Sequence, residues 1–304
     1  MNLPALLHLL LALVLAPLLL GIVNRTKAVF AGRRGQPLLQ AYYDIAKLLR
    51  KGAVYSRTTT WLFRAGPVVS LAALGAALAL VPLAGRGALV AFPGDLFVAV
   101  YLLALGRFCT VLAALDTGSS FEGMGGSREV QFAALAEPAL MIGLVVLARQ
   151  TGELSLSGMY HAVNPALWVT GGASLVLLAV AFFVVLLAEN ARIPCDDPST
   201  HLELTMIHEV MVLDHGGPEF GLITYGVSLK LWLFSALLAG LVVPVRTGVL
   251  WLDTAAAVAG IGAIGVGVGT VESGMARLRL LRVPQLLVSA AVAAVLAFLL
   301  LVAR

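Results

Sequence analysis

The sequence is poor in charged residues and in cysteine. Only 12% of its 304 residues are Asp, Glu, Lys or Arg, and its two cysteines are Cys109 and Cys195. A soluble domain carries about 25% charged and roughly 45–50% apolar residues, whereas this chain is 60% hydrophobic. This composition excludes an ordinary soluble enzyme. Because an iron–sulfur cluster takes about four thiolates, we expect no redox centre in this chain.

Long apolar runs fill most of the chain and predict eight membrane spans, since a spanning helix needs about 20 mostly apolar residues. The first run lacks a basic start and a clear cleavage site, so we interpret it as a retained span. No linker or repeat divides the sequence. We therefore expect an all-α integral membrane protein that forms one domain over residues 1–304. The runs lie near 3–23, 62–83, 95–115, 129–148, 167–188, 225–245, 250–271 and 283–303.

Lysine and arginine gather in alternate connections between these spans. The first, third, fifth and seventh connections hold Arg25, Lys27, Arg33, Arg34, Lys47, Arg50, Lys51, Arg57, Arg128, Arg192, Arg277, Arg279 and Arg282. The opposite side has only Arg86, Arg149, Arg246 and Arg304. The positive-inside rule then places the basic connections in the cytoplasm and both termini outside. The net charge of +4 reflects this topology rather than binding to nucleic acid.

Two amphipathic helices are expected on the cytoplasmic side. Residues 37–50 begin with a proline and carry apolar positions at helical spacing, which is typical of a helix that lies on a membrane surface. Residues 199–213 are predicted to form a second short helix. Ser199 or Thr200 would cap it, with Glu203 at the spacing of a capping box.

Several charged residues fall inside the spans or at their ends. A charge at the centre of a spanning helix costs roughly 2.5–3.5 kcal/mol, and burial disfavours the ionised form of a carboxylate. We interpret the carboxylates as members of a proton relay beside basic partners. Three structural alternatives stay open: an Arg107–Glu137 ion pair between spans, a Lys230 side chain that extends to the interface, and a Glu272 that ends a helix. The residues are Arg107, Glu137, Glu189, Lys230 and Glu272.

The connection after the fifth span is dense in charge and histidine. His201, His208 and His215 recur every seven residues and would share roughly one helix stripe. They lack the four-residue spacing of the HExxH zinc motif, so we expect contact with a partner subunit rather than a metal. An ordinary solvated face is the alternative. The acidic residues of this connection are Asp196, Asp197, Glu203, Glu209, Asp214 and Glu219.

Four segments of the chain resemble the membrane subunit of respiratory complex I called subunit 1 or the H subunit. The turn Ala188–Pro198 resembles its AETNRxPFDLPE signature. The continuation His201–Asp214 is more similar to the related subunit of group 4 membrane-bound NiFe hydrogenases, the branch of formate hydrogenlyase subunit 4 and hydrogenase-4 component C. Gly32–Lys51, Gly123–Pro138 and Glu272–Pro284 resemble the other cytoplasmic segments. The segments occur in order, so the resemblance covers effectively the whole chain.

This resemblance implies a place in a larger complex of a bacterial or archaeal plasma membrane. It implies a peripheral arm with hydrogenase-like large and small subunits and an iron–sulfur subunit, and antiporter-like membrane subunits. It implies a relay and coupling role for Glu137, Glu189, Asp196, Glu203 and Glu272. The resemblance also implies a set of charged residues that either lie at the junction with the arm or have a structural role. They are Arg128, Arg192, Asp197, Glu209, Arg107 and Lys230.

The sequence also departs from the quinone-using branch of that family. The first cytoplasmic segment lacks the GPNRVGP-type stretch, and Asp197 stands where that branch has leucine. We therefore expect no quinone site, and no cofactor in this chain. The expected function is to anchor the redox arm and couple it to proton or sodium movement. The alternatives are a quinone-site subunit of an NADH:quinone oxidoreductase, an independent ion transporter and a passive anchor.

Overall fold

The computed structural model describes residues 3–197, 205–244 and 247–303. Within these residues eight helices are long and apolar enough to cross a membrane, which confirms the predicted spans. They are α1 (Leu3–Phe30), α3 (Trp61–Leu80), α4 (Asp95–Asp116), α5 (Ser120–Thr151), α7 (Pro165–Glu189), α8 (Gly217–Val242), α9 (Leu250–Gly274) and α10 (Val283–Val302). Shorter helices are α2 (Gln40–Leu49), α6 (Leu156–Ala162), and the 3-10 turns η1 (Glu209–Val212) and η2 (Leu280–Arg282).

Local sequence signals fix several helix starts. The side chain of Asn164 accepts a hydrogen bond from the backbone of Leu167 at 2.9 Å, and Pro165 opens α7. Proline also stands in the first turn of α8 and of α10. A proline is favoured there because its missing N–H would have no partner within the helix. These signals place the helix starts that the apolar runs alone leave open.

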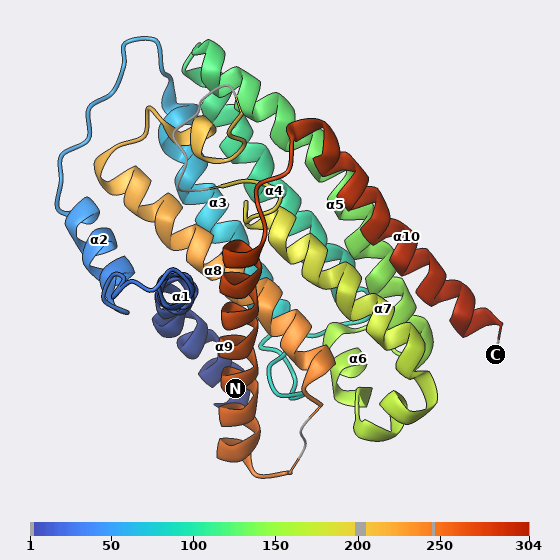
Figure 1. The fold of residues 1–304 in the computed structure, drawn as a ribbon. Helices are drawn as coiled ribbons and strands as arrows, with labels where there is room; N and C mark the ends of the chain where they lie inside the picture. The colour runs from blue at the N-terminus through green and yellow to red at the C-terminus, as the bar shows by residue number, and fades with distance from the viewer. Residues whose placement is uncertain (1–2, 198–204, 245–246, 304) are drawn as a thin grey trace.

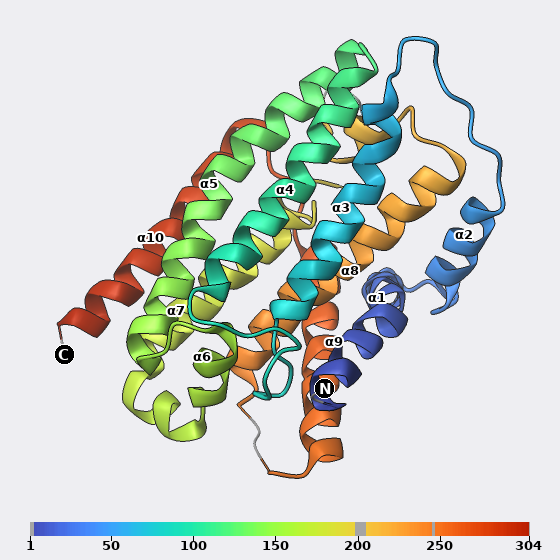
Figure 2. The same cartoon turned by 180° about the vertical axis from the view of Figure 1, so that it is seen from behind.

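Five of the long helices form a closed ring. Contacts run from α3 to α4, α5, α7, α8 and back to α3. Outside this ring, α1 and α9 pack together against α8, and α10 packs against α5 and α7 (Figures 1 and 2). Both termini lie away from the α4–α5 connection in these views. The ring matters for function because four of its helices turn charged side chains toward one another.

Residues 123–128, expected to precede the span near 129–148, are already helical. Helix α5 begins at Ser120. Gly125 in this stretch allows close packing against η1. A Cβ added at Gly125 would lie 2.3 Å from Cγ1 of Val210 in η1. The extra helical turns carry Arg128 and Glu129 on α5.

The predicted helix over 199–213 is also wrong for its described part. Residues 205–213 contain only the single turn η1. The backbone N–H groups of Ile207 and His208 donate to the carboxylate of Asp196 at 3.0 and 3.2 Å, so they do not enter a helical ladder. Thr200 and Glu203 lie outside the described residues. The helix expected in 37–50 is present as α2, which packs on α8 and α1.

Helices α1 and α9 approach each other closely at Gly269. A Cβ added there would lie 2.7 Å from Cβ of Thr26 and 2.9 Å from the backbone oxygen of Val23. Gly267, in the same helix, has no neighbouring atom within 4 Å of such a Cβ. Replacing Gly267 therefore tests helix propensity alone, and replacing Gly269 adds a steric conflict.

We expect Gly269→Ala to destabilise the purified protein by about 1–3 kcal/mol, the usual cost of overpacking. Gly267→Ala should be neutral or slightly stabilising because alanine favours the helix. Thermal unfolding in detergent, followed by tryptophan fluorescence, measures both. Equal melting temperatures for the two variants would show that the α1–α9 contact is looser than described.

Candidate functional site

Four helices of the ring meet in a cluster of five charged side chains, which we call the central cluster. Arg107 of α4 is buried, and its Nη2 lies 2.6 Å from both carboxylate oxygens of Glu189 at the end of α7. The same guanidinium contacts Glu137 of α5 and lies 3.3 Å from Glu129, two turns earlier on that helix. Lys230 of α8 lies 2.8 Å from Glu189. One arginine therefore holds three carboxylates together.

The central cluster contains more acid than base. Three carboxylates face one guanidinium and one ammonium, so the fully ionised cluster carries one excess negative charge. Surrounding helices exclude much of the water that would screen this charge. Uptake of a proton or another cation relieves the repulsion among the carboxylates. The arrangement can thus bind and release a positive charge when the position of Arg107 changes.

A second group of charges, the α9 cluster, lies beside the first. The side chain of Glu272 at the end of α9 is 0% exposed, and it is 2.8 Å from Lys27 of α1 and 3.4 Å from Arg192. A cavity of about 630 Å³, also lined by Arg33 and Gln36, adjoins Lys27 and Glu272. The α9 cluster therefore joins a buried carboxylate to a roomy polar cavity.

One tight turn connects the two clusters. Helix α7 ends at Glu189, and Ala191 follows with a φ of 49°. The backbone N–H of Arg192 then donates to the carbonyl of Leu187 at 2.8 Å. Glu189 and Arg192 thus leave the same turn and pair with different clusters. A movement of this turn would change both sets of ion pairs together.

Asp196 holds the rest of the α7–α8 loop (residues 190–216, with 198–204 outside the described residues). Its buried carboxylate accepts hydrogen bonds from Ile207 and His208 and, at 2.9 Å, from the backbone of Asp197. The guanidinium of Arg277, after α9, lies 2.9 Å from it. Asp196 therefore joins the two described parts of the loop to the α9–α10 connection.

The remaining residues singled out from the sequence lie around this loop. Arg128 donates to the backbone oxygen of Met206 at 2.7 Å, and Glu209 is half-buried at the start of η1. His215 stacks on Phe63 with ring centroids 3.9 Å apart. His208 lines a different cavity, described below. Glu203 and His201 lie outside the described residues.

The structure decides between several alternatives that the sequence left open. Arg107 and Glu137 do form an ion pair between spans, and they share it with Glu189. Lys230 is paired with Glu189, and Glu272 is a buried partner of two cations. The relay role of these residues stays a prediction.

Sequence reasoning missed Glu129 in the central cluster, Lys27 in the α9 cluster and Arg277, the partner of Asp196. Glu129 lies eight residues before Glu137, which is close to two turns and puts both on one face of a helix. The expected span near 129–148 already contained both residues, so this spacing was the signal that could have found Glu129. Lys27 and Arg277 meet partners that are distant in the sequence, and no spacing rule relates them.

A protein-family model matches almost the whole chain. Residues 3–303 match the family model described as NADH dehydrogenase. The chain belongs to this family. Among similar members is formate hydrogenlyase subunit 4 of Escherichia coli (strain K12), 33% identical over 75% of this chain and 73% of that protein. Hydrogenase-4 component C of the same strain is 32% identical over 76% and 72%.

Other similar proteins are more distant. The H subunit of the NADH-quinone oxidoreductase of Burkholderia vietnamiensis is 26% identical over 67% of this chain and 59% of that protein. The fold resembles a chain of the membrane-bound sulfane sulfur reductase, an archaeal respiratory membrane complex, with a TM-score of 0.79 and 20% identity over 97% and 98% of the two chains. The expected family is confirmed, and this member is a multi-pass membrane protein.

Cys195 reports on the packing of the α7–α8 loop. Burial, and then the negative charge of Asp196, raise the pKa of its thiol to about 12. The thiol therefore stays protonated and unreactive at pH 8 while the loop is closed. Opening of the loop would return the thiol to water and raise its thiolate fraction.

We expect Arg277→Gln, in a Cys109→Ser background, to speed the reaction of Cys195 with N-ethylmaleimide at pH 8 by at least about tenfold. The reason is that the variant loses the ion pair to Asp196 that closes the loop. Arg279→Gln, in the same connection, is the control. Labelling is followed by intact mass spectrometry, and equal rates in the two variants would show that Arg277 does not hold the loop.

Proposed function

We propose that this chain anchors and couples the redox arm of a hydrogenase- or formate hydrogenlyase-type oxidoreductase related to complex I. The observation that carries this proposal is the central cluster, in which one buried arginine holds three carboxylates within a ring of membrane-spanning helices. Such charges are costly in a membrane and mark ion pathways. Kinship with formate hydrogenlyase subunit 4 and hydrogenase-4 component C supports the hydrogenase branch.

Coupling starts in the α7–α8 loop. A redox change in the docked arm displaces this loop, and the displacement moves the turn that carries Glu189 and Arg192. Arg107 then shifts among its three carboxylates, and the carboxylate that it leaves takes up a proton. When the loop returns, Arg107 comes back and the proton is released. The docked redox arm and the central cluster therefore both act on the position of one two-state element, the α7–α8 loop. A coupling free energy between two sites requires such a shared element.

The basic connections face the cytoplasm in this proposal, and both termini face outward, in the plasma membrane of a bacterium or archaeon. The arm docks on the cytoplasmic side, where the described parts of the α7–α8 loop meet the α9–α10 connection. It contains the nickel–iron and iron–sulfur subunits. Antiporter-like subunits lie beside this chain in the membrane and receive the ion path.

A quinone-site role is less well supported. Drug-sized ligand pockets usually measure about 300–1,000 Å³ and are mostly apolar. The cavity beside the central cluster is about 80 Å³, well below that range. The larger cavity is lined mainly by polar and charged residues, among them Lys27, Arg33 and Glu272. The related proteins named above favour neither a quinone-site role nor an independent transporter.

We expect Glu137→Gln and Glu189→Gln each to lower the number of ions moved per electron by about 100-fold, the usual contribution of a proton-transferring group. Turnover of the arm with a soluble dye should stay normal. The number of ions moved per electron is measured on the assembled complex in proteoliposomes that contain a pH-sensitive dye.

The matched control is Glu153→Gln, an exposed carboxylate in the α5–α6 connection, away from the central cluster. It should leave ion movement unchanged. If the two cluster variants also keep the normal ratio, the chain is a passive anchor.

A further inference from the structure

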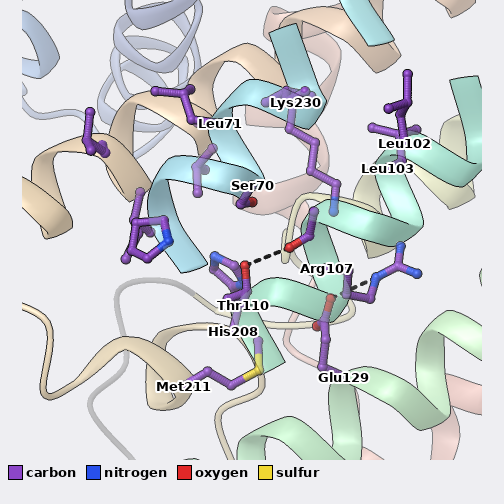
Figure 3. A pocket seen from close by; sticks show the side chains of 17 residues that line it. Ser70, Leu71, Leu102, Leu103, Arg107, Thr110, Glu129, His208, Met211 and Lys230 are labelled. Atoms are coloured by element: carbon purple, nitrogen blue, oxygen red, sulfur yellow. Dashed lines mark hydrogen bonds and ion pairs between the residues drawn. The ribbon is translucent and has the colours of Figure 1, made fainter. Parts of the chain in front are cut away.

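A small cavity of about 80 Å³ lies inside the ring, between α3, α4 and α8. Most of its wall is apolar, with Leu71, Leu102 and Leu103 among the lining residues (Figure 3). Three members of the central cluster complete the wall: Arg107, Glu129 and Lys230. The cavity therefore adjoins the charges that the proposed function uses.

His208 also lines this cavity, and it comes from the α7–α8 loop rather than from a spanning helix. Its Nε2 atom is buried and has no hydrogen-bond partner in the described part of the chain. A buried polar atom without a partner destabilises the fold unless something satisfies it. A water needs about 10–15 Å³ of this kind of volume, so the cavity that the imidazole and the cluster both line has room for water.

We propose that His208 passes protons from the cytoplasmic loop to Glu129 through water in this cavity. The inference rests on the proposed function and names the residue through which protons reach the central cluster. An N–H bond of the imidazolium breaks, a water relays the proton, and an O–H bond forms on the Glu129 carboxylate. The neutral ring then takes its next proton from water at the loop. Imidazole suits this step because it gains and loses protons near neutral pH.

The same geometry makes the step dependent on the loop. The backbone N–H of His208 is held at 3.2 Å by Asp196, which Arg277 holds in turn. A displacement of the loop therefore moves this imidazole relative to the cavity. Proton delivery is thus controlled by the element on which the arm acts.

Charged groups from each neighbouring element set the environment of this histidine. Arg107 of α4, Glu129 of α5 and Lys230 of α8 share the cavity wall with it. The start of α5, on which η1 packs, carries Glu122 and Arg128. The loop itself contributes Asp196 and Glu209.

The test uses the assembled complex in proteoliposomes, with ion movement per electron recorded between about pH 5.5 and 8.5. His208→Gln keeps a polar side chain but cannot carry a proton, so we expect the ratio to fall about 100-fold while dye-linked turnover of the arm stays normal. The pH dependence near neutrality should disappear. Imidazole added to His208→Ala should restore movement, which a packing role for His208 would not allow.

Matched controls separate the possible outcomes. His161→Gln, whose ring pairs with the backbone oxygen of Gly85 in another part of the fold, should behave as the unchanged protein does. Normal ion movement in His208→Gln together with impaired movement in Glu189→Gln would overturn the role of His208 and leave the proposed function standing. Normal movement in both would remove the proposed function as well.

Chemical modification of the unchanged complex tests the proposal even if the His208 variants fail to assemble. Diethyl pyrocarbonate modifies the imidazole of the unchanged complex, and mass spectrometry gives the modified fraction of His208. Loss of ion movement in proportion to that fraction supports the proposal. Full ion movement with His208 largely modified overturns it.

Discussion

The contact of Arg107 with three carboxylates governs the rest of this structure. A buried guanidinium stays charged, so its helix can enter the membrane only if acidic partners come from elsewhere. Those partners are Glu129 and Glu137 on α5 and Glu189 on α7. Their positions require α4, α5 and α7 to lie side by side, and Lys230 brings α8 to the same point. The closed ring of helices follows from this requirement together with apolar packing.

The clusters are connected through the least regular part of the fold. Glu189 ends a spanning helix and belongs to the central cluster, while Arg192 belongs to the α9 cluster and Asp196 holds the loop. Several of these side chains share more than one partner, so a shift of one charge changes the pairing of the others. A docked arm that moves the loop can therefore change ion pairs deep in the bundle without deforming the apolar core.

Much of this was predictable from the sequence, for physical reasons that differ by element. Each spanning helix is an apolar run of sufficient length, and Glu137 was evident as a charge between apolar neighbours. The early start of α5 was missed because the span was placed by its apolar run near 129–148, and the polar, glycine-containing residues before it are held as helix by contacts such as that of Gly125 with η1. The Lys27–Glu272 and Arg277–Asp196 pairs could not be predicted, since they depend on how distant helices pack.

Infrared difference spectroscopy of the assembled complex tests the central claim most directly. The account holds that a carboxylate of the central cluster gains a proton when the arm is reduced. Reduction should produce the C=O stretching band of a protonated carboxyl group, and Glu189→Gln or Glu137→Gln should shift or abolish that band. A reduction spectrum without a carboxyl band, or with a band unchanged in both variants, would contradict the account.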